Sequence, residues 1–169
     1  INNRGQVTGY SQIASGATRA FLWQNGVMVN IGTLATAATF ALGINQKTEI
    51  AGFGRVGGGG TPFHAFKWHN GAFTDLGTLG GNESFAYDIN DQGCVVGESE
   101  IDPGIPGLTH AFLWCDGVMT DLGTLGGPVS AANGINEKGQ IVGIAMTADF
   151  EFHAFSYENG VMTDLGVLP

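Results

Sequence analysis

The chain repeats one sequence pattern four times, and this repetition restricts the possible folds more than any other feature. An Ile-Asn pair recurs at Ile1, Ile44, Ile89 and Ile135, with spacings of 43, 45 and 46 residues. An Ala-Phe pair follows in each copy, at Ala20, Ala65, Ala111 and Ala154. Self-similarity at this period is typical of propellers and solenoids. We therefore divide the single repeat domain into units 1–43, 44–88, 89–134 and 135–169.

Each unit reads as short strands separated by turn residues. The third unit shows the pattern as "SFAYDIN", "CVVGES", "HAFLW" and "VMTDLGTL". An Asn-Gly or Asp-Gly pair, a strong hairpin signal, separates the last two segments of every unit: Asn25-Gly26, Asn70-Gly71, Asp116-Gly117 and Asn159-Gly160. No segment has a helical period. The pattern predicts an all-β chain, a β-propeller with four blades of about 45 residues, each a four-stranded antiparallel sheet.

Two alternatives remain open at this stage: a β-solenoid, or half of a larger propeller. The first segment of the unit occurs three times, whereas the other segments occur four times. The first unit therefore lacks its inner strand, and an unpaired strand edge is usually covered. We expect that strand to come from residues before Ile1 or from another chain.

Composition excludes several classes of partner. The net charge of −9, with only six Lys and Arg residues, disfavours nucleic acid and anionic membranes. No apolar run approaches the roughly 20 residues of a membrane helix, so no membrane insertion is expected. The chain opens on Ile1 inside a repeat, and we interpret it as part of a longer, exported product.

With these residues in view, the chain resembles the HAF repeat family of bacterial extracellular proteins. The resemblance rests on the pattern "IN..G.VVG.S....HAFLW..G.MTDLGTLGG..S.A", which covers essentially the whole chain. The first and last units depart from it, with Arg19 for His, Asn30 for Asp, "LATAA" for "LGGxx", and Ser156-Tyr157 for Leu-Trp. The resemblance implies a repeat architecture and export, and it brings no defined activity or catalytic residue.

The repeated histidines and aspartates are interpreted as scaffold. His64, His110 and His153 occupy equivalent places, which on successive blades lie about 10 Å or more apart, too far for one zinc ion. A glycosidase needs two carboxyl groups in different environments. The aspartates Asp75, Asp121 and Asp164 are near-identical copies instead, so we expect each to accept backbone N–H bonds at a glycine turn.

The repeated aromatic residues are expected in the core between blades. These are Trp23, Trp68, Trp114 and Tyr157, each sharing a strand face with a phenylalanine. A sugar-stacking shelf built on the Trp edges is the alternative. The polar "INxxG" turns are interpreted as capped turns, so no cofactor is expected. Calcium is the one metal left open, although no turn has the ligand density of an EF-hand loop.

Specific recognition is expected in the loops, because they vary while the scaffold repeats. The residues selected there as contacts for a ligand or partner are Arg55, Asp102, Pro103, Asp149 and Glu151. The rival hypothesis is a propeller glycosidase, which would need acidic residues that break the repeat. Its candidates are Glu98, Glu100, Asp102, Asp149 and Glu151.

The two cysteines predict a disulfide. If the second and third strands of the third unit form a hairpin around Gly104, opposed residue numbers add up to about 208, and those of Cys94 and Cys115 add up to 209. The other units carry polar pairs there, expected to be exposed: Gln6/Gln24, Glu49/His69 and Gln140/Glu158. A disulfide in this place indicates an oxidising compartment.

Together these features predict a non-catalytic extracellular or cell-surface propeller module with a structural, assembly or binding role. Carbohydrate binding is the alternative, and a glycosidase is the less favoured one. The expected partners are a second copy or further repeats, with a glycan as the other partner considered.

Overall fold

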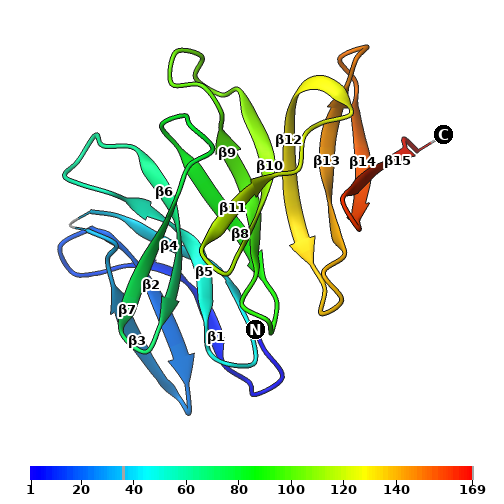
Figure 1. Cartoon of the computed structure of the whole chain (residues 1–169). Coiled ribbons are helices and arrows are strands. Elements are labelled where there is room, and N and C mark those ends of the chain that lie inside the picture. The colour runs from blue at the N-terminus through cyan, green and yellow to red at the C-terminus, as the bar shows by residue number, and fades with distance from the viewer. Residues whose placement is uncertain (36, 169) are drawn as a thin grey trace.

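The computed structural model describes residues 1–35 and 37–168, which form strands and no helix (Figure 1). Thr36, in the "LATAA" departure, and Pro169, at the end of the fourth unit, lie outside the described residues. The described residues contain no helix that could cross a membrane. The strands are β1 (Val7–Gln12), β2 (Thr18–Gln24), β3 (Val27–Gly32), β4 (Thr39–Ile44), β5 (Ile50–Arg55), β6 (Phe63–His69), β7 (Ala72–Gly77), β8 (Ser84–Ile89), β9 (Val95–Glu100), β10 (Thr109–Cys115), β11 (Val118–Asp121), β12 (Gly126–Ile135), β13 (Ile141–Thr147), β14 (Phe152–Glu158) and β15 (Val161–Gly166).

The strands form four antiparallel sheets in chain order. The first sheet holds β1-β2-β3, and the other three hold β4-β5-β6-β7, β8-β9-β10-β11 and β12-β13-β14-β15. Each sheet is a meander in which consecutive strands are neighbours, as in propeller blades. The predicted all-β propeller is confirmed, and the solenoid alternative is wrong. The first sheet has three strands because its counterpart of β4, β8 and β12 is missing.

Tight turns between the last two strands of each sheet place the hairpins. Asn25 and Gly26 both have positive φ, 52° and 79°, and the equivalent residues of the other sheets behave alike. Two successive residues at positive φ are the signature of a type I′ turn, whose twist matches that of the strands. The hairpin prediction from the Asn-Gly and Asp-Gly pairs is therefore confirmed.

The core consists of three apolar clusters, each between two successive sheets. Phe66, Phe112 and Phe155 are fully buried, at equivalent places in the second, third and fourth sheets. Trp68 and Trp114 are 9% and 8% exposed and belong to these clusters. Burial of aromatic side chains is the largest apolar contribution in such a core. The sheets are thus held face to face by the residues that the sequence repeats.

A hydroxyl group ties each sheet to the one before it. Ser84 Oγ, at the start of β8, accepts the backbone N–H of Ala65 at 2.8 Å and donates to the carbonyl of Gly77 at 2.6 Å. Thr39 and Ser130 make the same two contacts with the sheets before them. Because these hydroxyls are buried, both of their hydrogen bonds stabilise the stack.

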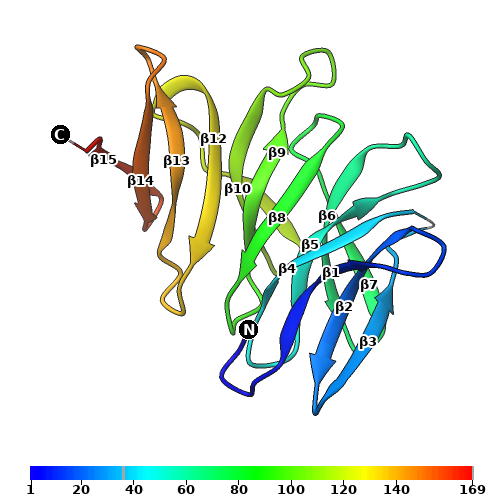
Figure 2. The ribbon, with the colours of Figure 1, turned by 180° about the vertical axis from the view of Figure 1, so that it is seen from behind.

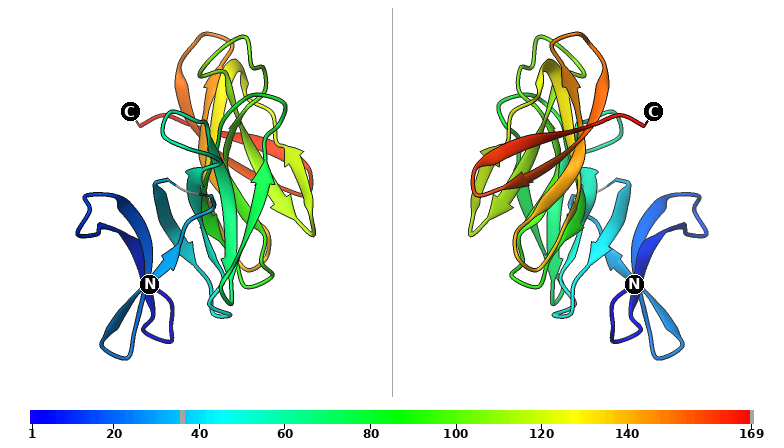
Figure 3. Two further views of the ribbon diagram at one scale, coloured as in Figure 1. Left: turned by 90° about the vertical axis from the view of Figure 1, so that its left-hand side faces the viewer. Right: turned by 90° about the vertical axis from the view of Figure 1, so that its right-hand side faces the viewer.

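The four sheets lie side by side along an arc. The first strands of successive sheets contact one another, β4 with β8 and β8 with β12. Figures 1 and 2 show the first and fourth sheets at opposite ends of the molecule, and Figure 3 shows the same arc from its two sides. This open arc agrees with the alternative in which the chain forms half of a larger propeller.

Candidate binding surface

Each repeated histidine lies beside the repeated aspartate of the next strand. The Nδ1 to carboxylate distances are 3.0 Å for His64–Asp75, 2.9 Å for His110–Asp121 and 2.9 Å for His153–Asp164. Each aspartate also accepts the backbone N–H of the glycine two residues on, as in Asp121–Gly123 at 2.7 Å. These contacts join the last two strands of a sheet at the point where the chain leaves it.

The same contacts lower the pKa of the aspartate in the fourth sheet. The hydrogen bond from Gly166 N–H, and secondly that from His153, hold the pKa of Asp164 below its ordinary value. In the first sheet Asn30 keeps only the backbone contact, to Gly32 at 2.9 Å, and Arg19 instead donates to the carbonyl of Ala37. Each His–Asp pair thus joins the last two strands of its sheet. Across the described residues no three His, Cys, Asp or Glu side chains gather as they would around a metal.

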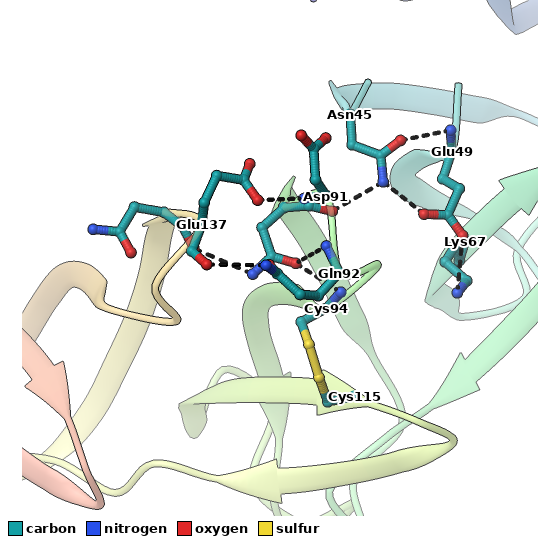
Figure 4. Close-up of a disulfide and its surroundings, with 10 residues drawn as sticks. Asn45, Glu49, Lys67, Asp91, Gln92, Cys94, Cys115 and Glu137 are labelled. Carbon is teal, nitrogen blue, oxygen red and sulfur yellow. Dashed lines mark hydrogen bonds and ion pairs between the residues drawn. A yellow bond between two sulfur atoms is a disulfide. The ribbon is translucent and has the colours of Figure 1, made fainter. Parts of the chain in front are cut away.

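The "INxxG" turns form a ladder along the four sheets. Each asparagine caps its own turn: Asn90 Oδ1 accepts the N–H groups of Gln92 and Cys94 at 3.1 and 3.0 Å. Its Nδ2 also donates to the carbonyl of Asn136 in the next sheet, at 3.2 Å. Asn2 and Asn45 donate in the same way to Asn45 and Asn90, both at 2.9 Å. The ladder therefore runs from the first sheet to the fourth, and Figure 4 shows the part of it that begins at Asn45.

A second line of contacts follows the ladder. The backbone N–H of Asn3 donates to Gln46, that of Gln46 to Asp91, and that of Asp91 to Glu137, over 3.1, 2.7 and 2.9 Å. Turn capping was predicted for these residues, but the links between sheets were missed. Their only sequence signal is the presence of a hydrogen-bonding side chain after each asparagine.

Replacing Asn90 by aspartate is expected to destabilise the fold by about 1–3 kcal/mol, because Asn90 is 3% exposed and the hydrogen bond that its Nδ2 donates to the carbonyl of Asn136 is lost. The matched control is Asn136→Asp, which keeps the turn cap and loses only a donor to Gln140 at an exposed position. Urea unfolding of the two variants checks the difference. Equal losses of free energy would contradict a link between sheets.

The disulfide lies at the cross-strand position that the register predicts. Trp114 pairs with Val95, so Cys115 stands opposite Cys94, and the two form a disulfide with 4.5 Å between their Cα atoms (Figure 4). Gln6 and Gln24 hold the same place in the first sheet and are joined by a side-chain hydrogen bond of 2.8 Å. The disulfide prediction is confirmed. The expected exposure of the polar pairs is wrong for Gln6, which is 4% exposed because Asn2 and Thr48 cover its amide.

The variable loops lie together at one end of the sheets, opposite the ladder (Figure 1). Arg55 lines a pocket between the loops of the second and third sheets, together with Glu83 and Glu100. Its guanidinium stands over the ring of Phe63, 4.1 Å from the centroid, and donates to the carbonyl of Thr61. Glu100 is buried and accepts the N–H groups of Asn82 and Gly107. Its carboxylate thus holds two loops in place.

The other loop residues selected from sequence are spread over two loops. Asp102 accepts the N–H of Gly104 at 2.8 Å, and the carbonyl of Pro103 accepts Asn82 Nδ2 at 3.3 Å. Asp149 is exposed in the loop between β13 and β14, where Glu151 lies 3.8 Å from Nε2 of His153. The structure therefore brings Asp102 and Pro103 near the Arg55 pocket through Asn82, and it places Asp149 and Glu151 on the neighbouring loop of the fourth sheet.

An aromatic row near this end was missed by sequence reasoning. It consists of Tyr10, Phe40, Phe53, Phe63 and Phe85, whose neighbouring ring centroids are 4.9–6.0 Å apart. Tyr10 is 54% exposed, and the other four are half-buried. Phe40 and Phe85 lie in the first strands of their sheets, Tyr10 and Phe53 in second-strand positions, and Phe63 at the start of the third strand, β6. In the sequence all of these aromatic residues except Phe63 stand beside Gly or Ala, and this alternation was the signal that could have indicated the row.

Glu98 stands at the end of the row. It accepts a hydrogen bond of 2.6 Å from the Tyr87 hydroxyl and one of 3.2 Å from Thr109 Oγ1. Burial, and secondly this bond to Glu98, raise the pKa of Tyr87, so the phenol stays protonated and donates. Glu98 also lines a pocket between the third and fourth sheets with Ile144 and Phe152. Aromatic faces beside a carboxylate suit a hydroxyl-rich ligand.

Comparison with known proteins identifies the fold. No protein-family model matches the chain, and no curated protein matches it. Among solved structures, TolB from Acinetobacter baumannii aligns with a TM-score of 0.65 and 11% identity, over 95% of this chain and 40% of that one. A putative TolB from Agrobacterium tumefaciens aligns with a TM-score of 0.69 and 12% identity, over 95% and 60%.

A third solved structure is a propeller domain by itself. The β-propeller domain of the Trilobed protease from Pyrococcus furiosus aligns with a TM-score of 0.63 and 13% identity, over 96% of this chain and 51% of that domain. The chain thus spans 40–60% of the length of these three chains. At such low identity the likeness shows the fold alone: this chain is a β-propeller module.

Proposed function

We propose that this propeller module is non-catalytic and works outside the cell as a structural or binding element. One observation carries the proposal: the side chains of catalytic type recur in successive sheets and have the same scaffold partners each time. His64, His110 and His153 each bond one aspartate, and each of those aspartates bonds a backbone N–H. Catalytic carboxylates need environments that differ from each other.

Export is supported by the disulfide and by the resemblance to the HAF repeat family. Disulfides persist in oxidising compartments and are rare in the cytosol. Cys94 and Cys115 are the chain's two cysteines and are paired with each other. Quantifying free thiols in protein taken from its native host tests this proposal. Two free thiols per chain would count against export.

The aromatic row favours carbohydrate binding as the second candidate function. Affinity electrophoresis in polysaccharide gels, combined with an assay for released reducing sugar, separates the candidates. A structural module migrates unretarded, whereas a carbohydrate-binding module is retarded without release of sugar. If the aromatic row binds the polysaccharide, the gel should retard the Tyr10→Ala variant less than the wild type. The control Tyr157→Ala, which lies outside the row, should be retarded as strongly as the wild type. Release of sugar that disappears in Glu98→Gln would overturn the non-catalytic proposal in favour of a glycosidase.

A further inference from the structure

Aromatic rings fill two of the three junctions between the described sheets, near the loop end. Between the first and second sheets, Tyr10 meets Phe40 with ring centroids 5.0 Å apart. Between the second and third sheets, Phe85 meets Phe53 and Phe63 at 5.0 and 6.0 Å. Contacts of this kind bury aromatic surface between packed sheets. Both junctions are therefore occupied by side chains of the protein itself.

The junction between the third and fourth sheets holds a cavity instead. The repeat shows which residues take the positions of the rings there. Those at the positions of Phe53, Phe63 and Phe85 are, in that order, Glu98, Thr109 and Ala131. All three line a cavity of about 220 Å³. The cavity therefore lies where one sheet meets the next and where the rings of the preceding junction have no counterpart.

Two neutral donors hold the carboxylate of Glu98 at this cavity. The Tyr87 hydroxyl donates to one of its oxygens at 2.6 Å, and Thr109 Oγ1 donates to the other at 3.2 Å. Tyr87 also departs from the repeat, since Leu42 and Asn133 hold its place in the second and fourth sheets. Three departures from the repeat, Tyr87, Glu98 and Thr109, thus act together to place one carboxylate.

This half-buried carboxylate has no cationic partner among residues 1–35 and 37–168, because the ion pairs found there all involve other acidic residues. A charge that is partly removed from water is usually paired. A cation entering the cavity would supply the partner through a charge-assisted hydrogen bond to Glu98, which is about twice as strong as a neutral one. A further neutral hydroxyl would add less, since two hydroxyls already donate to Glu98.

The other walls determine what else the ligand must carry. Val129, Ala131, Ile144 and Phe152 line the cavity from the fourth sheet, and all four are apolar. The cavity is smaller than the roughly 300–1,000 Å³ of sites that take drug-sized ligands. A ligand that fits it is therefore a small molecule with an apolar part and one charged end.

We infer that this cavity binds a small primary amine in its ammonium form, with the ammonium group donating to Glu98 and an apolar ring lying between the third and fourth sheets, where the preceding junction has rings of its own. The net charge of −9 attracts such cations toward the protein. The inference rests on the proposed non-catalytic binding role. It names a ligand class for the Glu98 cavity and is independent of polysaccharide binding by the aromatic row.

Isothermal titration calorimetry with phenethylammonium chloride tests the site. We expect one molecule to bind per chain with a dissociation constant of about 0.1–1 mM, a range that suits a ligand of this size. Phenethyl alcohol has the same ring without the charge and should bind about tenfold more weakly or worse. The Glu98→Gln variant keeps an acceptor for Tyr87 and should lose affinity for the amine by a similar factor. The control Glu158→Gln removes an exposed carboxylate outside the cavity and should bind like the wild type.

A second variant fills the cavity. Ala131→Phe introduces the residue that Phe40 and Phe85 supply at this position in the second and third sheets, so it should fold and should no longer bind the amine. Far-UV circular dichroism and the melting temperature verify that each variant is folded. Absence of amine binding by the wild type, equal affinity for the alcohol, or full affinity in Glu98→Gln or Ala131→Phe would overturn the site.

The outcome is distinguishable from a failure of the proposed function. A wild-type chain that binds no amine and releases no sugar would leave the non-catalytic proposal standing and remove the amine site. Sugar release that depends on Glu98 would overturn the non-catalytic proposal, whatever the affinity for the amine.

Discussion

The Gly97→Ala variant is expected to melt about 6–12 °C below the wild-type chain, as follows from a loss of about 3 kcal/mol in a chain of this size. Gly97 in β9 pairs with Ala86 in β8, where the pairing register shifts between Ala86 and Asp88. A Cβ at Gly97 would overlap the carbonyl oxygen of Phe85 and stand 2.9 Å from the Cα of Ala86. Backbone atoms in a paired strand cannot move aside, so the sheet itself must distort.

The chain contains its own control for this prediction. Gly9 occupies the equivalent place in the first sheet, where the innermost strand is missing. A Cβ there meets only ring carbons of Phe21, at 3.0 Å, and this side chain is half-buried and can rotate. Gly9→Ala is therefore expected to cost less than about 1 kcal/mol, the lower end for an added methyl group. Differential scanning calorimetry measures both variants. Equal losses would mean that the inner strand does not restrict this position.

Removing the disulfide is expected to produce the second large loss. Cys94 and Cys115 are 21 residues apart, and closing a loop of this length in the unfolded chain is worth about 3 kcal/mol. Cys94→Ser/Cys115→Ser should lose about that amount, and dithiothreitol should destabilise the wild type alone. Urea unfolding with and without reductant provides the measurement.

A second double variant separates the covalent bond from the contact between strands. Cys94→Gln/Cys115→Gln restores the pair found in the first sheet, where Gln6 donates to Gln24 at 2.8 Å. A side-chain hydrogen bond of this kind contributes about 0.5–1.5 kcal/mol. The Gln pair should therefore recover part of the loss. A serine variant as stable as the wild type would show that the hairpin needs no crosslink.

The fold was predictable because its signals are local and occur several times. Asn70-Gly71 specifies a hairpin without reference to the rest of the chain, and φ is positive at both residues. The register of β9 on β10 then followed from the loop position alone, which is why the Cys94–Cys115 pair could be predicted. Burial of Trp68 and Trp114 followed from their place on a strand face, but the same prediction was wrong for Trp23, which is 37% exposed because no sheet of the described residues packs on that face.

The binding surface was less predictable because its contacts join distant segments. Tyr10 makes an edge contact with Phe40, and Phe53 with Phe85, across neighbouring sheets, so the pattern of strands in the sequence does not indicate the row. Asn90 was correctly interpreted as a turn cap because its Oδ1 contacts are local. The hydrogen bond from its amide to Asn136 depends on how the third and fourth sheets are placed against each other. This placement is set by packing between the sheets, so no local sequence pattern indicates it.

The asparagine ladder also bears on how such a gene changes its copy number. The second and third sheets each accept one amide from the sheet before and supply one amide to the sheet after. Insertion or loss of a whole unit by recombination therefore preserves the pattern of amide contacts between the sheets that remain. As far as these amide contacts are concerned, the stack can lengthen or shorten without compensating mutations in the units that remain.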